Sequence, residues 1–185
     1  MKELSLNILD IAMNSVKAKA KNVGIYIEEK DNFLTLTFVD DGCGMTFEQV
    51  EKLRDPFFTT RTTRKVGLGV PFLTLAAEQT GGEVTIESRP ESEFPESHGT
   101  TVKATFDKTS IDFTPLGDVV STVITLVQGS PDIDFVFSHK KGENEVSLDT
   151  KELKSVLGEG VSLSEPEVLA WIKGSLEEEY SSFTD

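Results

Sequence analysis

The residues with the clearest chemical potential form one short segment, Asp40-Asp41-Gly42-Cys43-Gly44-Met45. It follows an alternating apolar run, Phe33 to Val39, that indicates a strand, and it precedes Thr46 to Gln49, which is typical of a capped helix start. Two glycines so close together let a flat ligand lie against the backbone. The Asp40 carboxylate accepts hydrogen bonds only, so it suits the amino group of a planar base such as adenine and disfavours guanine. The alternative is an ordinary Asp-Gly turn.

A second segment, Gly67-Leu68-Gly69, leads directly into a predicted helix from Val70 to Thr80 with Pro71 in its first turn. Backbone N–H groups at a helix start point toward an anion, and the helix dipole favours negative charge there. A phosphate is therefore the expected occupant. No Lys-Ser/Thr follows these glycines and no Gly-x-Gly-x-x-Gly is present, which disfavours both a P-loop and a Rossmann site.

The N-terminal helix, predicted over residues 4–18, carries a narrow polar stripe on a mostly apolar helix. The stripe consists of Glu3, Asn7, Asp10, Asn14 and Lys17. Since the rest of the helix is apolar, we expect it to be largely buried. The stripe then faces either solvent or a polar cavity, and its acid, amides and lysine would suit a nucleotide and its metal.

These groups must be positioned by a sheet and its helices. Residues 23–27 and 33–39 are predicted to form a hairpin, residues 47–54 a short helix, and residues 83–89 and 100–106 two further strands. Residues 59–69 show no helical or strand period and are predicted to form a loop rich in hydroxyls and positive charge. Because helices and strands come in blocks, we predict an α+β fold: a two-layer sandwich of a mostly antiparallel mixed sheet with helices on one face.

The composition of the chain restricts the kinds of partner, compartment and metal site that we expect. The chain has 185 residues and a net charge of -14, which disfavours nucleic-acid and membrane partners. It contains no apolar run near the roughly 20 residues of a membrane span and no secretory signal, so we expect a cytoplasmic protein. The single cysteine, Cys43, agrees with a reducing compartment, and two histidines make a zinc site improbable.

The charge divides the chain into two predicted domains. Residues 1–109 carry 17 acidic and 13 basic residues, whereas residues 110–185 carry 15 acidic and 5 basic residues. The second part is an acidic α/β extension, with predicted helices over 115–127, 150–157 and 165–180 and a hairpin of residues 133–138 and 145–148. Trp171 is expected on the apolar face of the last helix. The extension serves either as a docking surface or as an addition to the core.

Five ordered motifs resemble the GHKL ATPases, the superfamily that includes gyrase B, Hsp90, histidine kinases and MutL. They are Asp10 to Ser15, Asp40 to Gly44, Asp55 to Arg61, Gly67 to Gly69 and Gly99 to Thr101. In order and spacing they match the N box, the first glycine box, the F box, the second glycine box and the closing Gly-Thr. The resemblance covers roughly residues 3–108, and the stretch from Asp55 to Gly69 looks most like the ATP-binding domain of a histidine kinase.

The resemblance implies ATP and Mg²⁺ as ligands, with a role for each matching residue. Asp40 would accept from the adenine amine with Thr100 nearby, Gly42, Gly44 and Met45 would line the base pocket, Asn14 would bind Mg²⁺, and Lys17 would reach a phosphate. Residues from the F box and second glycine box would close on the triphosphate: Phe58, Thr59, Thr60, Arg61, Gly67, Leu68 and Gly69. Asp10 stands where gyrase B and MutL have a catalytic glutamate, so it is either the base or a group near the metal.

Three functions follow from the resemblance. The first is a protein kinase that phosphorylates an unidentified partner in trans, because no phospho-accepting histidine helix precedes the N box in this sequence. The second is an interaction module, similar to MutL in logic, that hydrolyses ATP slowly and forms a homodimer or captures a partner when ATP binds. The third is a domain that binds nucleotide without turnover, as the shorter Asp10 allows.

Overall fold

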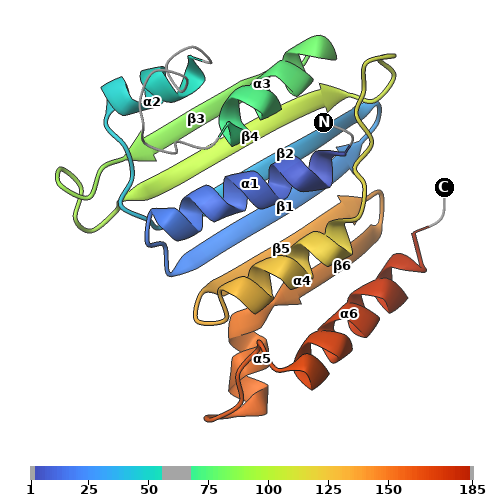
Figure 1. Ribbon diagram of the computed structural model, residues 1–185. Coiled ribbons are helices and arrows are strands. Elements are labelled where there is room, and N and C mark those ends of the chain that lie inside the picture. Colours follow the sequence, from blue (N-terminus) through green and yellow to red (C-terminus); the bar gives the residue numbers. More distant parts are fainter. Residues whose placement is uncertain (1–2, 56–67, 184–185) are drawn as a thin grey trace.

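The sheet and its helices are described by a computed structural model over residues 3–55 and 68–183 (Figure 1). The helices are α1 (Leu4–Lys17), α2 (Phe47–Arg54), α3 (Gly69–Gln79), α4 (Val119–Gly129), α5 (Thr150–Leu157) and α6 (Pro166–Tyr180). The strands are β1 (Asn22–Lys30), β2 (Phe33–Asp40), β3 (Val84–Arg89), β4 (Gly99–Asp107), β5 (Asp134–Lys141) and β6 (Asn144–Asp149).

The strands form one sheet in the order β3-β4-β2-β1-β5-β6. Every neighbouring pair is antiparallel except β1 and β5, which run parallel because α4 crosses over between β4 and β5. Helices α1, α3 and α4 lie across the same face of this sheet (Figure 1). The predicted α+β sandwich, a mostly antiparallel mixed sheet with helices on one face, is confirmed.

Alternation along the strands separates the two faces of the sheet. In β1, Val23, Ile25 and Ile27 are buried beneath the helices, whereas Tyr26 and Glu28 are exposed on the opposite face. The same alternation in β2, β4 and β5 builds one continuous apolar core between helices and sheet. The helix-facing side of β2 and β4 is therefore the face on which α1 can position polar groups.

Residues after the predicted boundary at 109 continue the same sheet. β5 pairs with β1 and α4 packs beside α1, so the second part shares the apolar core of the first. The predicted helix over 115–127 begins later than expected, at Val119. The backbone N–H groups of Leu4 and Ser5 donate to the carbonyls of residues 115 and 116, which holds this segment outside the helix against the start of α1. Asp118 then caps the helix.

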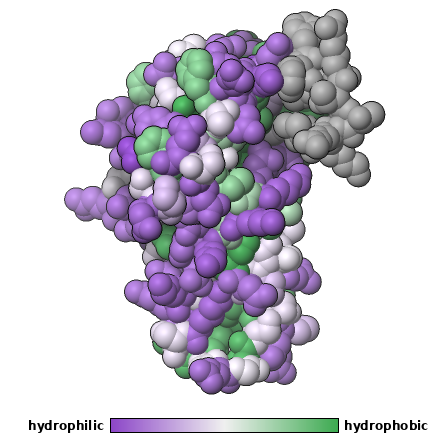
Figure 2. Space-filling model, turned by 90° about the vertical axis from the view of Figure 1, so that its left-hand side faces the viewer, coloured by the Kyte–Doolittle hydropathy of each residue, from purple (hydrophilic) through white to green (hydrophobic). Residues whose placement is uncertain are grey.

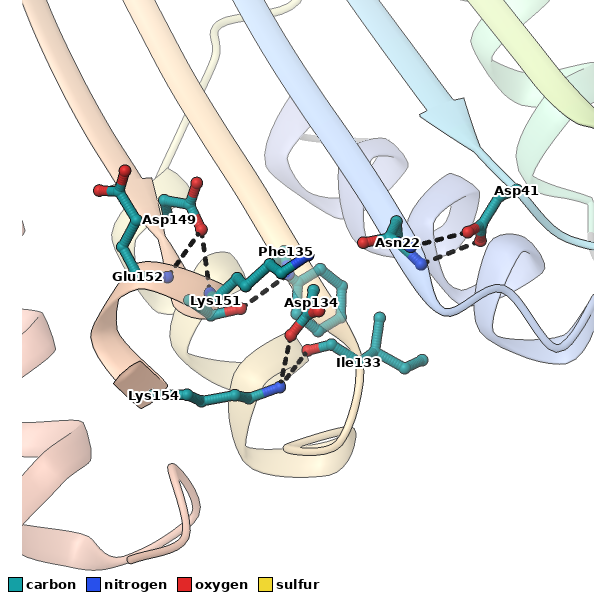
Figure 3. Close-up of polar contacts among 10 residues, drawn as sticks. Asn22, Asp41, Ile133, Asp134, Phe135, Asp149, Lys151, Glu152 and Lys154 are labelled. Carbon is teal, nitrogen blue, oxygen red and sulfur yellow. Dashed lines mark hydrogen bonds and ion pairs between the residues drawn. The ribbon is translucent and has the colours of Figure 1, made fainter. Parts of the chain in front are cut away.

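Helix α5 is fixed to the sheet by side chains at both of its ends (Figure 3). At its start, the Asp149 carboxylate accepts from the N–H groups of Lys151 and Glu152. Farther along, Lys154 Nζ lies 2.8 Å from Asp134 Oδ1 and donates to the carbonyl of Ile133 at 3.2 Å. These contacts hold α5 at the foot of β5 and β6.

Among the helices in the described ranges, none has both the length and the apolar character that a membrane crossing requires.

Candidate active site

Asp40 ends β2 with its carboxylate held in a fixed orientation. The Ser15 hydroxyl on α1 donates to Asp40 Oδ2 over 2.6 Å, and the Gly42 N–H donates to Asp40 Oδ1 over 2.9 Å. A carboxylate oxygen accepts more than one hydrogen bond, so each oxygen keeps acceptor capacity for a ligand. The two donors therefore orient an anionic acceptor at the end of β2 rather than saturate it.

The neighbouring Asp41 has a different, structural role. Its carboxylate accepts from the backbone N–H groups of Lys21 and Asn22 and from the Asn22 side-chain amide, at 2.8 to 2.9 Å (Figure 3). Partial burial favours its neutral form, but the hydrogen bonds from Asn22 and Lys21 outweigh burial and lower the pKa of Asp41. Asp41 thus ties the turn to the start of β1, as a turn former would.

The turn after Asp40 is clamped between α1 and the loop that joins β3 to β4. The Cys43 N–H donates to the Ala18 carbonyl at 2.9 Å, and the Cys43 carbonyl accepts from Glu91. His98 Nδ1 donates to the Gly42 carbonyl over 2.6 Å. Gly44 has φ +66°, and a Cβ there would lie 1.9 Å from the Arg89 carbonyl oxygen, so only glycine fits.

A hydroxyl pair lies next to Asp40 on β3 and β4. Asp40 is paired in register with Thr100, and Thr100 with Ser88. The Ser88 and Thr100 hydroxyls are 2.7 Å apart, and the Ser88 hydroxyl also accepts from the Met45 N–H at 2.8 Å. Ser88 therefore links the turn to the hydroxyl that stands beside Asp40.

These groups enclose a cavity of about 240 Å³ between α1 and the sheet. Its apolar walls are contributed by Ile11, Phe38, Met45, Leu53, Val70 and Val102. Asn14, Asp40 and Thr100 also line it, and Lys17 stands at its rim on α1. Whole small-molecule ligands fill pockets of about 300–1,000 Å³, so this cavity suits a planar base and leaves charged parts of a ligand outside.

The polar stripe of α1 extends away from this cavity. Asp10 is exposed, one turn before Asn14, and a Cβ added to Gly69 would lie 3.0 Å from the Cβ of Asp10. Asp10 thus lies beside the N-terminus of α3, and no side chain caps that helix start within the described residues. An acid, an amide and helix N–H groups are thus brought together next to the cavity, an arrangement that suits an anion such as a phosphate.

Asn14 and Asp10 also fit a magnesium ion. Mg²⁺ takes oxygen ligands, keeps several waters and is usually held by one or two protein oxygens together with substrate phosphates. The Asn14 amide lines the cavity and the Asp10 carboxylate lies four residues earlier on the same helix face. Within residues 3–55 and 68–183, no group of three or more His, Cys, Asp or Glu side chains could hold a metal ion.

The structure brings together most of the predicted site residues that it describes. Asn14, Lys17, Asp40, Gly44, Met45 and Thr100 line the cavity. Gly42 lies on the outer side of the turn, Leu68 is an exposed residue just before α3, and Asp10 and Gly69 lie beyond the cavity. Phe58, Thr59, Thr60, Arg61 and Gly67 fall outside the described residues.

Sequence reasoning did not single out Ser15, Ser88 or His98 as site residues. Ser15 is buried in α1, and a serine is uncommon at a buried position unless its hydroxyl has a partner. A serine on the apolar face of a predicted helix was therefore the one signal that the sequence offered. Ser88 and His98 reach the turn through strand register and loop packing, which no local pattern encodes.

Comparison with known proteins gives two kinds of match: curated proteins of similar sequence and solved structures of similar fold. This chain is 32% identical to sporulation kinase E of Bacillus subtilis over 89 residues, which is 48% of this chain and 12% of that kinase. The signal transduction histidine-protein kinase AtoS of Escherichia coli is 29% identical over 49% of this chain and 15% of its own length. The chain thus aligns with only a small part of these curated relatives.

The fold is similar to that of solved structures over a longer range. The Aquifex aeolicus MutL ATPase domain complexed with ADP superposes with a TM-score of 0.54 at 15% identity, covering 100% of this chain and 71% of that one. The N-terminal domain of a DNA repair protein superposes with a TM-score of 0.58 at 13% identity, covering 80% of this chain and 53% of that one. At these identities the likeness is one of fold.

Residues 1–110, more than half of the chain, match the model of one ATPase family. This range runs from α1 to β4 and contains all of the residues that line the cavity. The chain belongs to the histidine kinase-, DNA gyrase B- and HSP90-like ATPases.

Proposed function

We propose that this protein binds ATP with its adenine in the cavity between α1 and the sheet. The observation that carries the proposal is the oriented Asp40 carboxylate in the wall of an apolar slot, with the Thr100 hydroxyl beside it. Such an acceptor pairs with the amino group of adenine, whereas the guanine carbonyl would meet a carboxylate that has no proton to donate. Relatives in the family and the ADP-bound MutL domain with the same fold support this reading.

Beyond the base, the α1 stripe would handle the phosphates. Asn14 would hold Mg²⁺ against the phosphate oxygens, Lys17 would neutralise one phosphate, and the N-terminus of α3 would face another. The Mg²⁺ would supply charge neutralisation at the phosphate oxygens. Phosphoryl transfer requires mostly positioning and electrostatic stabilisation, and these residues would supply both.

We propose further that the γ-phosphoryl group is transferred to a partner protein. A nucleophilic side chain of the partner would form a bond to the γ-phosphorus as the bond to the β-phosphate oxygen breaks, and ADP would leave. Asp10 would accept the proton that the nucleophile loses. The kinases among the relatives support this version.

The alternative is an ATP-dependent interaction module that hydrolyses ATP slowly. A specific observation favours it: the fold likeness to the MutL ATPase domain covers the whole chain, including α4 to α6, whereas the kinase relatives match about half of it. In this version water takes the place of the partner nucleophile, and Asp10 would accept its proton. ATP-dependent dimerisation or partner capture would follow.

Titration calorimetry with ATP, ADP and GTP, each with and without Mg²⁺, tests the binding proposal. We expect ATP and ADP to bind, GTP to bind at least about tenfold more weakly, and Mg²⁺ to strengthen ATP binding more than ADP binding. Equal affinity for ATP and GTP would remove the proposed role of Asp40. Incubation of labelled ATP with host extract then separates phosphoryl transfer to a protein from release of free phosphate.

A further inference from the structure

A second concave surface lies at the opposite edge of the sheet from β3. It is a groove of about 640 Å³, here called the α6 groove, and its floor is the helix-free face of β1, β5 and β6. One wall is α6, on which Trp171, Ser175 and Glu179 recur every four residues and so share one helix face. The other wall is α5, with Glu152 and Val156.

Large apolar side chains are exposed in this groove. Trp171 is 60% exposed, Val156 81%, Tyr26 40% and Val136 36%. Trp171 was grouped with Leu169 and Ile172 on the apolar face of its helix, as a tryptophan that could be exposed. It is exposed, on the side of α6 that Leu169, Ile172 and Leu176 do not occupy. Figure 2 shows a mostly hydrophilic surface on this side of the molecule, with hydrophobic residues exposed toward its lower end as well as in its upper half.

The floor of the groove is shaped to present an aromatic ring. A Cβ added to Gly24 would lie 2.6 to 2.9 Å from atoms of the Tyr26 ring, so that ring lies down across the glycine. With any other residue at position 24 the ring would have to move off the sheet. The result is a flat apolar floor beside Val136, a cross-strand neighbour of Gly24 in the pairing of β1 with β5.

Carboxylates surround these apolar residues. Glu28, Glu145, Asp149, Glu152 and Glu179 line the groove. Lys140 is the one lysine or arginine among the described residues that line it, and its Nζ lies 3.9 Å from Glu145 Oε1. The Asp149 and Glu152 side chains lie on the same side of α5 (Figure 3). The groove therefore carries an excess of negative charge around apolar anchor points.

Four other kinds of occupant fit poorly. A second copy of the chain placed on this groove by two-fold symmetry would bring the same carboxylates face to face. A nucleic acid or an anionic membrane would meet the same repulsion. Addition of a strand to β6 is opposed because Glu179 Oε2 on α6 already accepts from the Ser147 N–H at 3.0 Å.

We propose that the α6 groove binds a basic, partly apolar segment of a partner protein, with aliphatic or aromatic side chains against Trp171, Tyr26 and Val136 and lysine or arginine side chains against Glu28 and Glu152. Aromatic anchors that are surrounded by complementary charge are typical of protein interfaces. The groove lies on β1, β5 and β6, whereas the nucleotide cavity lies on β2 and β4, so this inference is independent of the proposed function.

The single tryptophan of the chain makes the groove directly observable. We would titrate the intact protein with a short peptide in which lysine alternates with leucine, and follow both Trp171 emission and the anisotropy of a dye on the peptide. The expected result is a saturable blue shift that coincides with the anisotropy change. A matched peptide with glutamate in place of lysine should bind at least about tenfold more weakly.

Paired variants separate the groove from general attraction to an acidic protein. Glu28→Lys combined with Glu152→Lys should weaken binding about tenfold or more, whereas Glu91→Lys combined with Glu96→Lys, which makes the same change in net charge on the β3–β4 loop, should change it less than about twofold. Val156→Ser should weaken binding, and Ile111→Ser, at a 98% exposed position outside the groove, should not.

Three results would overturn the proposal. Equal weakening by both charge-reversal pairs would show general electrostatic attraction, and peptide binding without any change in Trp171 emission would place the contact elsewhere. Concentration-dependent dimerisation that Val156→Ser abolishes, measured by sedimentation, would identify the occupant as a second copy of this chain.

Discussion

The Ser15 hydroxyl donates a 2.6 Å hydrogen bond to Asp40 Oδ2, and this contact joins the central helix to the end of the central strand β2. Ser15 is almost fully buried, and Asp40 lines the cavity between α1 and the sheet. A hydrogen bond to a charged acceptor is stronger than one between neutral groups. Ser15 is therefore a positioning residue, which holds the carboxylate in the orientation that a base would meet.

Replacing Ser15 by alanine should weaken ATP binding by about fivefold to tenfold, because the carboxylate loses one of the two donors that orient it. Titration calorimetry measures the change. Ser121→Ala is the matched control, since Ser121 makes the same 2.6 Å hydrogen bond to Asp118 at the start of α4, away from the cavity. Similar losses of ATP affinity in both variants would indicate a general effect on stability.

Replacing Asp40 by asparagine should reduce the preference for ATP over GTP by about tenfold or more. The amide can donate to the guanine carbonyl, and it accepts less strongly from the adenine amine. Asp41→Asn is the comparison, because Asp41 bonds to Lys21 and Asn22 and lies outside the cavity wall. It should lower stability and leave the ATP-to-GTP ratio of affinities unchanged; the reverse pattern would assign the base contact to Asp41.

Replacing Asp10 by asparagine should abolish most phosphate release or transfer and leave ATP affinity within about threefold of the parent protein. Asp10 lies beside the start of α3 and outside the base cavity, so its loss removes a proton acceptor without removing the base contacts. Asp10→Glu should retain turnover, because it keeps the carboxylate and lengthens it by one methylene. Unaltered turnover in Asp10→Asn would favour nucleotide binding without Asp10-dependent chemistry.

The order of elements in the first hundred residues could be predicted from sequence because each element has a local signal. The capping box at Thr46 and Gln49 is present as expected, and the alternation in β1 and β2 matches their burial. The predicted start of α4 was wrong because hydrogen bonds from the backbone of α1 hold residues 115 and 116 outside the helix, and such contacts are not local. The apolar period of the last helix groups Trp171 with Leu169 and Ile172, because a period alone does not distinguish a core face from a groove wall.

The candidate site also contains residues with local signals and residues without them. Asp40, Gly44 and Asn14 could be predicted because a turn, a glycine requirement and a polar helix stripe each depend on neighbouring residues. Ser88 became visible only through the register of β3 against β4, which places it opposite Thr100. Whether the parts before and after residue 109 behave as separate domains stays a prediction, although they share one sheet and one core.

Replacing Asn7 by leucine should stabilise the fold by about 1–3 kcal/mol. Asn7 is buried in α1, and neither its amide nitrogen nor its amide oxygen has a hydrogen-bond partner among the described residues. A leucine of similar size removes the free-energy cost of burying an amide without hydrogen bonds. Urea unfolding measures the increase in the free energy of unfolding, and the dependence of that free energy on urea concentration should be unchanged. Asn22→Leu is the contrasting variant, because it removes an amide that Asp41 does bind, and it should destabilise the protein.

The free energy of unfolding should fall as the pH drops below about 6.5, because several side chains at the edge of the core are joined by hydrogen bonds through His139. His139 Nε2 donates to Glu29 Oε1 at 2.9 Å, and the Tyr180 hydroxyl donates to His139 Nδ1 at 2.8 Å. Lys108 pairs with the other oxygen of Glu29 at 3.1 Å. Both nitrogens of the neutral ring are thus satisfied, and a protonated ring would face the Tyr180 donor with a second N–H.

The pKa shifts set the pH range of each loss. Burial lowers the pKa of His139 from 6.5 and outweighs the attraction of Glu29, and nearby Lys141 lowers it further. The unfolded chain therefore takes up this proton first as the pH falls, and up to about 1.4 kcal/mol is lost per pH unit until the folded protein is protonated too. Hydrogen bonds from Lys108 and His139 outweigh the burial of Glu29 and lower its pKa, which adds a second loss below pH 4.5.

At alkaline pH the dependence is reversed, and stability falls as the pH rises. Burial and the charges of Glu29 and Glu179 raise the pKa of Tyr180 well above 10.0, so the unfolded chain loses this proton first and stability falls above that pH. Urea midpoints across the pH range test all three phases. His139→Gln should remove only the loss that begins near pH 6.5, and His98→Gln, which removes the other histidine, should retain it. If both variants keep that phase, another group with a lowered pKa is responsible for it.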